Sequence, residues 1–135
     1  MRPRSIVLFE TLSLAAVGLG LLVLALTWNA LLANVNARIR AAGVEPAMMI
    51  LAAIYVLVLV MLILLISRRG SVAAKWLFAA IILAETLFTV PGLPAMLRGG
   101  IIGWTQILQL VVQLAALWFL FAPQSRGWGR RGAAA

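Results

Sequence analysis

The chain has 135 residues, of which 65% are hydrophobic and only 10% are charged, and it contains no cysteine, histidine or aspartate. This composition excludes disulfide bonds, metal sites built on histidine or cysteine, and Ser-His-Asp or Cys-His catalytic arrangements. The net charge of +8 comes from short basic clusters between long apolar runs, which favours contact with anionic lipid headgroups over nucleic acid.

Four apolar runs follow one another, over residues 6–33, 47–66, 72–90 and 101–122. Each is close to or above the ~20 residues that a helix needs to cross a bilayer. Because backbone polar groups cannot stay unpaired in lipid, each run predicts a transmembrane helix. The sequence therefore predicts a single all-α domain over residues 1–135, an integral membrane four-helix bundle that ends in a basic cytoplasmic tail over residues 123–135.

The first run carries polar and small residues near one helical face. These residues are Glu10, Ser13, Ala16, Gly20 and Thr27. Small side chains let two helix backbones approach closely, so this face is predicted to pack against another helix. Glu10 lies near the start of the run, and we expect it to form an ion pair at the membrane interface. Its candidate partners are Arg4, Arg68, Arg69 and Lys75.

The connections between the later runs differ in kind. The stretch SRRGS is short: Gly70 is suited to ending one helix and Ser71 to capping the start of the next. The second and third helices should therefore be antiparallel neighbours. The stretch PGLPAMLRGG, residues 91–100, holds two prolines and three glycines, which predicts an irregular connection at the membrane surface.

The third run contains a carboxylate, Glu85, and the fourth carries Gln106, Gln109 and Gln113 on one helical face. Glu85 and Gln109 each lie about 20 Å along their helices from the same side of the membrane, at 1.5 Å per residue. An amide or carboxyl in hydrocarbon needs a partner. The sequence therefore predicts that Glu85 meets Gln109 or Gln113 across the third and fourth helices.

This polar cluster has two interpretations. Glu85 and the glutamines can form hydrogen bonds that fix helix packing, or they can form a proton- or cation-coupling site, as intramembrane carboxyls often do. The structural interpretation is favoured because the chain offers no second deep ionisable residue for a relay. Burial disfavours the charged form, so we expect the neutral form of a carboxyl at this depth to be accessible at pH 7.

The basic residues predict the orientation of the helices. Three of them fall on one side of the bilayer, namely Arg38, Arg40 and Arg98. The other eight fall on the opposite side, namely Arg2, Arg4, Arg68, Arg69, Lys75, Arg126, Arg130 and Arg131. Since basic residues concentrate on the cytoplasmic side, both termini are predicted to be cytoplasmic, with these eight residues at the lipid headgroups.

Three segments carry a family resemblance: RPRSIVLFETLSLAAVGLGLLVLALTW, LLISRRGSVAAKW and QILQLVVQLAALWFLFAP. Together they cover over half the chain, and they resemble a group of small four-span inner-membrane proteins of bacteria for which no activity is known. The resemblance implies a multi-pass protein of the bacterial inner membrane and brings no reaction with it.

The sequence favours a non-enzymatic role in interaction, assembly or as an accessory protein. No nucleotide loop, metal cluster or nucleophile pair stands out, so no cofactor, metal or catalytic residue is predicted. The expected partners are the lipid bilayer and either further copies of the chain or another membrane protein. The alternative is a small proton- or cation-coupled transporter or channel subunit that uses Glu85 and the glutamine face.

Overall fold

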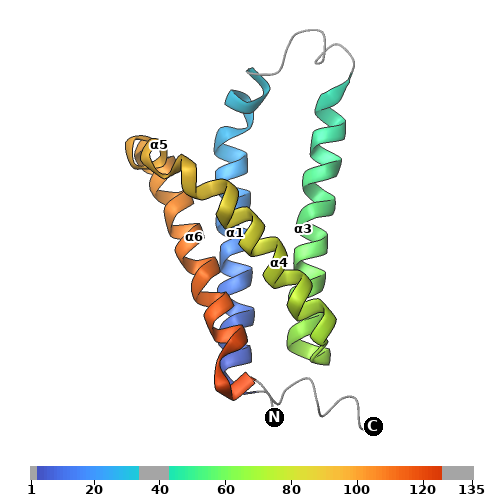
Figure 1. Ribbon diagram of the computed structural model, residues 1–135. Coiled ribbons are helices and arrows are strands. Elements are labelled where there is room, and N and C mark those ends of the chain that lie inside the picture. The colour runs from blue at the N-terminus through green and yellow to red at the C-terminus, as the bar shows by residue number, and fades with distance from the viewer. Residues whose placement is uncertain (1–2, 34–42, 126–135) are drawn as a thin grey trace.

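The computed structural model describes residues 3–33 and 43–125 (Figure 1). Its elements, in chain order, are α1 (Arg4–Ala33), α3 (Val44–Arg69), α4 (Val72–Thr89), η1 (Val90–Gly92), α5 (Leu93–Arg98), α6 (Gly100–Phe121) and η2 (Pro123–Ser125). Within the described ranges there are no strands, and four helical stretches are long and apolar enough to cross a membrane. The predicted all-α membrane four-helix bundle is confirmed.

The helices extend slightly beyond the predicted apolar runs. Helix α1 begins at Arg4, and α3 runs from Val44 to Arg69, so basic residues at the membrane boundary belong to the helices themselves. The third predicted run, residues 72–90, is one residue longer than helix α4, because Val90 belongs to the 3-10 turn η1. Of the predicted basic tail, the structure describes only residues 123–125, so the tail's arginines lie outside the described residues.

The four long helices are not equally close to one another. Helices α1 and α6 pack together more extensively than any other pair of helices in the described part of the chain. Helix α4 starts beside the end of α3 and then runs obliquely across the bundle toward α6 (Figure 1). The start of α1, the α3–α4 turn and the end of α6 therefore lie at one end of the molecule, at the bottom of Figure 1.

The α3–α4 turn has the predicted glycine and serine caps. Gly70 takes the left-handed conformation at φ 62°, and its N–H donates to the carbonyl of Ile66. The Ser71 N–H donates to the carbonyl of Leu65, which completes a glycine-terminated helix end. The Ser71 hydroxyl in turn accepts from the N–H of Ala74 at 3.2 Å and caps α4.

The connection between α4 and α6 is not irregular, and this prediction was wrong. Residues 90–98 form the 3-10 turn η1 and the short helix α5, and each has a proline in its first turn. A proline there removes an N–H that has no helical partner, so it starts a helix as readily as it breaks one. Helix α5 then folds back closely on α6, with the carbonyl of Met96 pressed against Gly103.

The hydrophobic core lies toward the end of the molecule that holds the α3–α4 turn. Phe9 of α1 meets Phe78 of α4 edge to face, with ring centroids 5.3 Å apart. The other core residues come from the last part of α3, the first part of α4 and the last part of α6; they are Leu59, Leu62, Ile63, Ile66, Ala74, Ile82, Ala116 and Leu120. The opposite halves of the helices supply few buried residues, and the cavities lie there.

Candidate functional site

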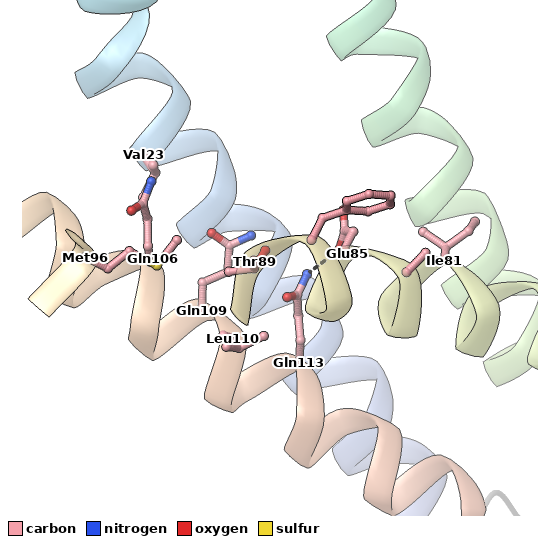
Figure 2. A pocket seen from close by; sticks show the side chains of 11 residues that line it. Val23, Ile81, Glu85, Thr89, Met96, Gln106, Gln109, Leu110 and Gln113 are labelled. Carbon is pink, nitrogen blue, oxygen red and sulfur yellow. Dashed lines mark hydrogen bonds between the residues drawn. The ribbon is translucent and has the colours of Figure 1, made fainter. Parts of the chain in front are cut away.

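Glu85 of α4 and Gln113 of α6 meet between the two helices. The Gln113 side-chain Nε2 donates a hydrogen bond to the Glu85 carboxyl Oε2 at 3.1 Å (Figure 2). Both side chains are partly buried. The helical depth of the two residues predicted this contact, and of the two glutamines offered as partners, the structure selects Gln113.

The other two glutamines point into a cavity of about 520 Å³ between α4, α5 and α6. Figure 2 shows Gln106, Gln109 and Gln113 in a row along α6. Within residues 3–33 and 43–125, the side chains of Gln106 and Gln109 have no hydrogen-bond partner. We call this space the α4–α6 cavity; its lining is Val23, Ile81, Ala84, Glu85, Phe88, Thr89, Met96, Gln106, Gln109, Leu110 and Gln113.

The electrostatic character of the α4–α6 cavity is set by one group. Among the described residues that line it, Glu85 is the only ionisable side chain, and neither arginine nor lysine is present. The rest of the wall is apolar or carries neutral amide and hydroxyl groups. The cavity therefore suits neutral hydrogen-bonding groups or a cation, and its described lining has no positive charge to hold an anion.

Gln109 also contacts the first helix. A methyl group on Gly20 would lie 2.9 Å from the Gln109 Nε2, so the missing side chain at Gly20 makes room for the amide. A second space of about 330 Å³ opens on this side, between α1 and α3, and Glu85, Gln109 and Gln113 line it as well. The polar cluster therefore lies between two cavities.

The predicted packing face of α1 is buried in part. Ser13 and Ala16 are buried, Gly20 receives Gln109, and the Ser13 hydroxyl has no hydrogen-bond partner among the described residues. Thr27 contributes no polar contact to another helix, because its hydroxyl donates to the carbonyl of Val23 in its own helix at 2.7 Å. From Ser13 to Thr27 the face packs through the small size of its side chains, and Glu10 alone among its residues accepts a hydrogen bond from another helix in the described ranges.

Glu10 has a partner that the sequence analysis missed. The Ser67 hydroxyl of α3, which is fully buried, donates a hydrogen bond to the Glu10 carboxyl Oε2. Both residues lie near the same end of the bundle, Glu10 six residues after Arg4 and Ser67 next to Arg68. Matching depths, which predicted the contact of Glu85, would have found this pair too.

Most basic residues of the described ranges are exposed. Arg4, Arg68 and Arg69 are exposed at the end of the molecule that holds the α3–α4 turn. The ammonium of Lys75 lies 4.4 Å from the centre of the Phe121 ring, which adds a cation–π contact between α4 and α6. Arg2, Arg126, Arg130 and Arg131 of the predicted headgroup set lie outside the described residues.

The part of the chain that the structure describes brings together no three Asp, Glu, His or Cys side chains that could bind a metal ion. The polar cluster offers one carboxyl and three amides, and Thr89 of the α4–α6 cavity adds a hydroxyl, all of them able to take part in hydrogen bonds. Comparison of the chain with protein-family models, with curated proteins and with solved structures finds no match.

Proposed function

We propose that this chain is a non-enzymatic membrane protein with a role in interaction, assembly or as an accessory subunit, and that it works by lateral association in the bilayer. The observation behind the proposal is the state of Gln106 and Gln109, whose amides line the α4–α6 cavity without a hydrogen-bond partner among the described residues. An amide inside a membrane is stabilised by a partner across a helix interface. A second polypeptide in the α4–α6 cavity supplies hydrogen-bond partners for the two amides.

A second copy of the same chain is the partner we favour. A carboxamide carries both a donor and an acceptor, so two copies of Gln106 can bond to each other across a two-fold axis. Most soluble oligomers are homo-oligomers with closed symmetry, and a contact across a two-fold axis is self-complementary. The setting we propose is the bacterial inner membrane, with anionic headgroups at the end that holds Arg4, Arg68 and Arg69.

Disulfide cross-linking tests the association. The chain has no native cysteine, so one introduced thiol reports on one position. Ala84→Cys places it on the exposed rim of the α4–α6 cavity, and we expect oxidation in native membranes to yield a covalent dimer. Gln106→Leu with Gln109→Leu in the same background should lower the dimer yield at least fivefold, because the amides that bond across the interface are gone.

Val111→Cys provides the matched control. Val111 is exposed on α6 and does not line the α4–α6 cavity. Equal dimer yields from Ala84→Cys and Val111→Cys would show random collision in the membrane. That result, or an unchanged yield after loss of both glutamines, would contradict association through the α4–α6 cavity.

A small proton- or cation-coupled transporter or channel subunit is the second candidate. The observation that favours it is the position of Glu85 and Gln113, which are hydrogen-bonded to each other and line both cavities. A carboxyl group is therefore in reach of both spaces. Such a carboxyl can exchange a proton or meet a cation.

Glu85→Gln tests this candidate. Glutamine can still pair with Gln113 but cannot carry a proton, so the helices should pack as before while flux is lost. The measurement is proton movement and rubidium uptake in liposomes that contain the purified protein. Flux that persists in Glu85→Gln, or that is absent in the wild-type chain, counts against transport and leaves association as the function.

A further inference from the structure

An apolar groove runs between α1 and α3, apart from the α4–α6 cavity. It has a volume of about 660 Å³, and we call it the α1–α3 groove. Its floor is half-buried, while its rim residues, such as Leu21, Met49 and Leu57, are exposed. The groove extends along α3 from Met49 to Val60, roughly 16 Å at 1.5 Å per residue. This is a long, narrow and open shape.

The groove adjoins the polar cluster on its inner side. The 330 Å³ space beside Gly20 shares four wall residues with the groove, so the two spaces lie against each other; these residues are Leu21, Leu24, Ala52 and Val56. At the inner end the wall becomes polar, with Glu85, Gln109, Gln113 and Tyr55. The groove is therefore apolar along its length, and beside Leu21, near its inner end, it adjoins a polar wall.

From this arrangement we infer that the α1–α3 groove binds an elongated, uncharged lipid with a single hydrogen-bonding end, such as a long-chain alcohol or quinone. Its apolar chain lies along the groove, and its hydroxyl or carbonyl group accepts a hydrogen bond from the Gln109 amide. The Gln109 amide is suited to this because it has no hydrogen-bond partner among the described residues and Gly20 leaves space beside it.

Charge and depth select this class of ligand. No ionisable residue lines the α1–α3 groove among the described positions, and the polar end lies inside the apolar span, where a charged headgroup is costly to place. A phospholipid would have to bring its phosphate to that depth. The Gln109 Nε2 lies beside Gly20, and a bilayer acyl chain there would leave it without an acceptor, whereas a neutral polar end supplies one. The Gln109 carbonyl and the Gln106 amide stay available to a partner chain in the α4–α6 cavity.

Trp28 gives a direct reporter, because it lines the groove. The experiment uses a variant in which Trp76, Trp104, Trp118 and Trp128 are replaced by Phe, in liposomes titrated with a decyl-substituted benzoquinone, which quenches tryptophan fluorescence. We expect saturable quenching of Trp28. The matched control keeps only Trp118, which is 77% exposed on α6, and should show quenching that rises linearly as the probe partitions into lipid.

Three substitutions locate the site. Ala52→Phe fills the groove and should abolish the saturable phase, while Ala80→Phe, on the exposed side of α4, should leave it unchanged. Gln109→Leu should raise the half-saturating probe concentration about fivefold, as expected for the loss of one ordinary hydrogen bond. Linear quenching of Trp28, or saturation that Ala52→Phe does not alter, overturns the inference; an unaltered half-saturation in Gln109→Leu overturns the polar contact.

Photolabelling of the wild-type chain tests lipid binding in the groove without any substitution. A long-chain alcohol with a photoreactive diazirine in its tail should label residues 21–28 and 49–60, mapped by mass spectrometry. Labels spread evenly over all four helices would overturn the inference. So would an efficient disulfide between two copies of Ala53→Cys, because a protein helix would then occupy the groove.

Discussion

Among the described glycines, Gly103 is the one at which an added methyl group would come closest to the backbone of another element. A methyl group there would lie 1.8 Å from the carbonyl oxygen of Met96 and 2.7 Å from its carbonyl carbon. Both are backbone atoms, so they cannot turn away as a flexible side chain would. We expect Gly103→Ala to push α5 off α6 and to lower the free energy of unfolding by about 1–3 kcal/mol or more, measured by SDS titration in mixed micelles.

Gly18→Ala is the control for that change. Gly18 lies inside α1 and is exposed, and a methyl group there would meet nothing within 4 Å. The free energy of unfolding of the Gly18→Ala variant should stay level or rise by up to ~1 kcal/mol, because alanine favours the helix more than glycine does. If Gly103→Ala behaved like Gly18→Ala, the close approach of Met96 would be refuted.

At the level of single elements, the α3–α4 turn depends on one side-chain cap. The Ser71 hydroxyl accepts from the Ala74 N–H, which otherwise has no helical partner at the start of α4. Ser71→Ala should cost about 1 kcal/mol in the same SDS titration, and Ser71→Thr, which keeps the hydroxyl, should cost much less. Equal losses from both variants would mean that the cap does not contribute.

The helices and this turn could be predicted from the sequence, whereas the crossing angles could not. Apolar length fixes each helix, and the depth of Glu85 along its helix predicted Gln109 or Gln113 as its partner, of which the structure shows Gln113. The oblique path of α4 depends on which side chains fit together, so neither the α4–α6 cavity nor the α1–α3 groove was foreseen. The prolines at 91 and 94 were misinterpreted because proline both breaks and starts helices.

At the scale of the whole molecule, the two ends are built differently. The end with the α3–α4 turn holds the aromatic and aliphatic core, the exposed arginines and the Lys75–Phe121 contact. The opposite half holds the cavities, where helices separate and amides lack partners in the described ranges. Association and lipid binding are both proposed in this open half, so its position relative to the cytoplasm decides which molecules can reach it.

Reporter fusions test that position. The order of the apolar runs predicts eight basic residues on the side of the compact end and three on the other, so we expect the compact end to face the cytoplasm. Alkaline phosphatase, which is active only in the periplasm, should be inactive when fused to the C-terminus and active when fused after Arg98. A fluorescent protein, which folds in the cytoplasm, should fluoresce when fused to the C-terminus and stay dark when fused after Arg98. Phosphatase activity at the C-terminus would reverse the orientation and place the open half, with Glu85 and its cavities, toward the cytoplasm.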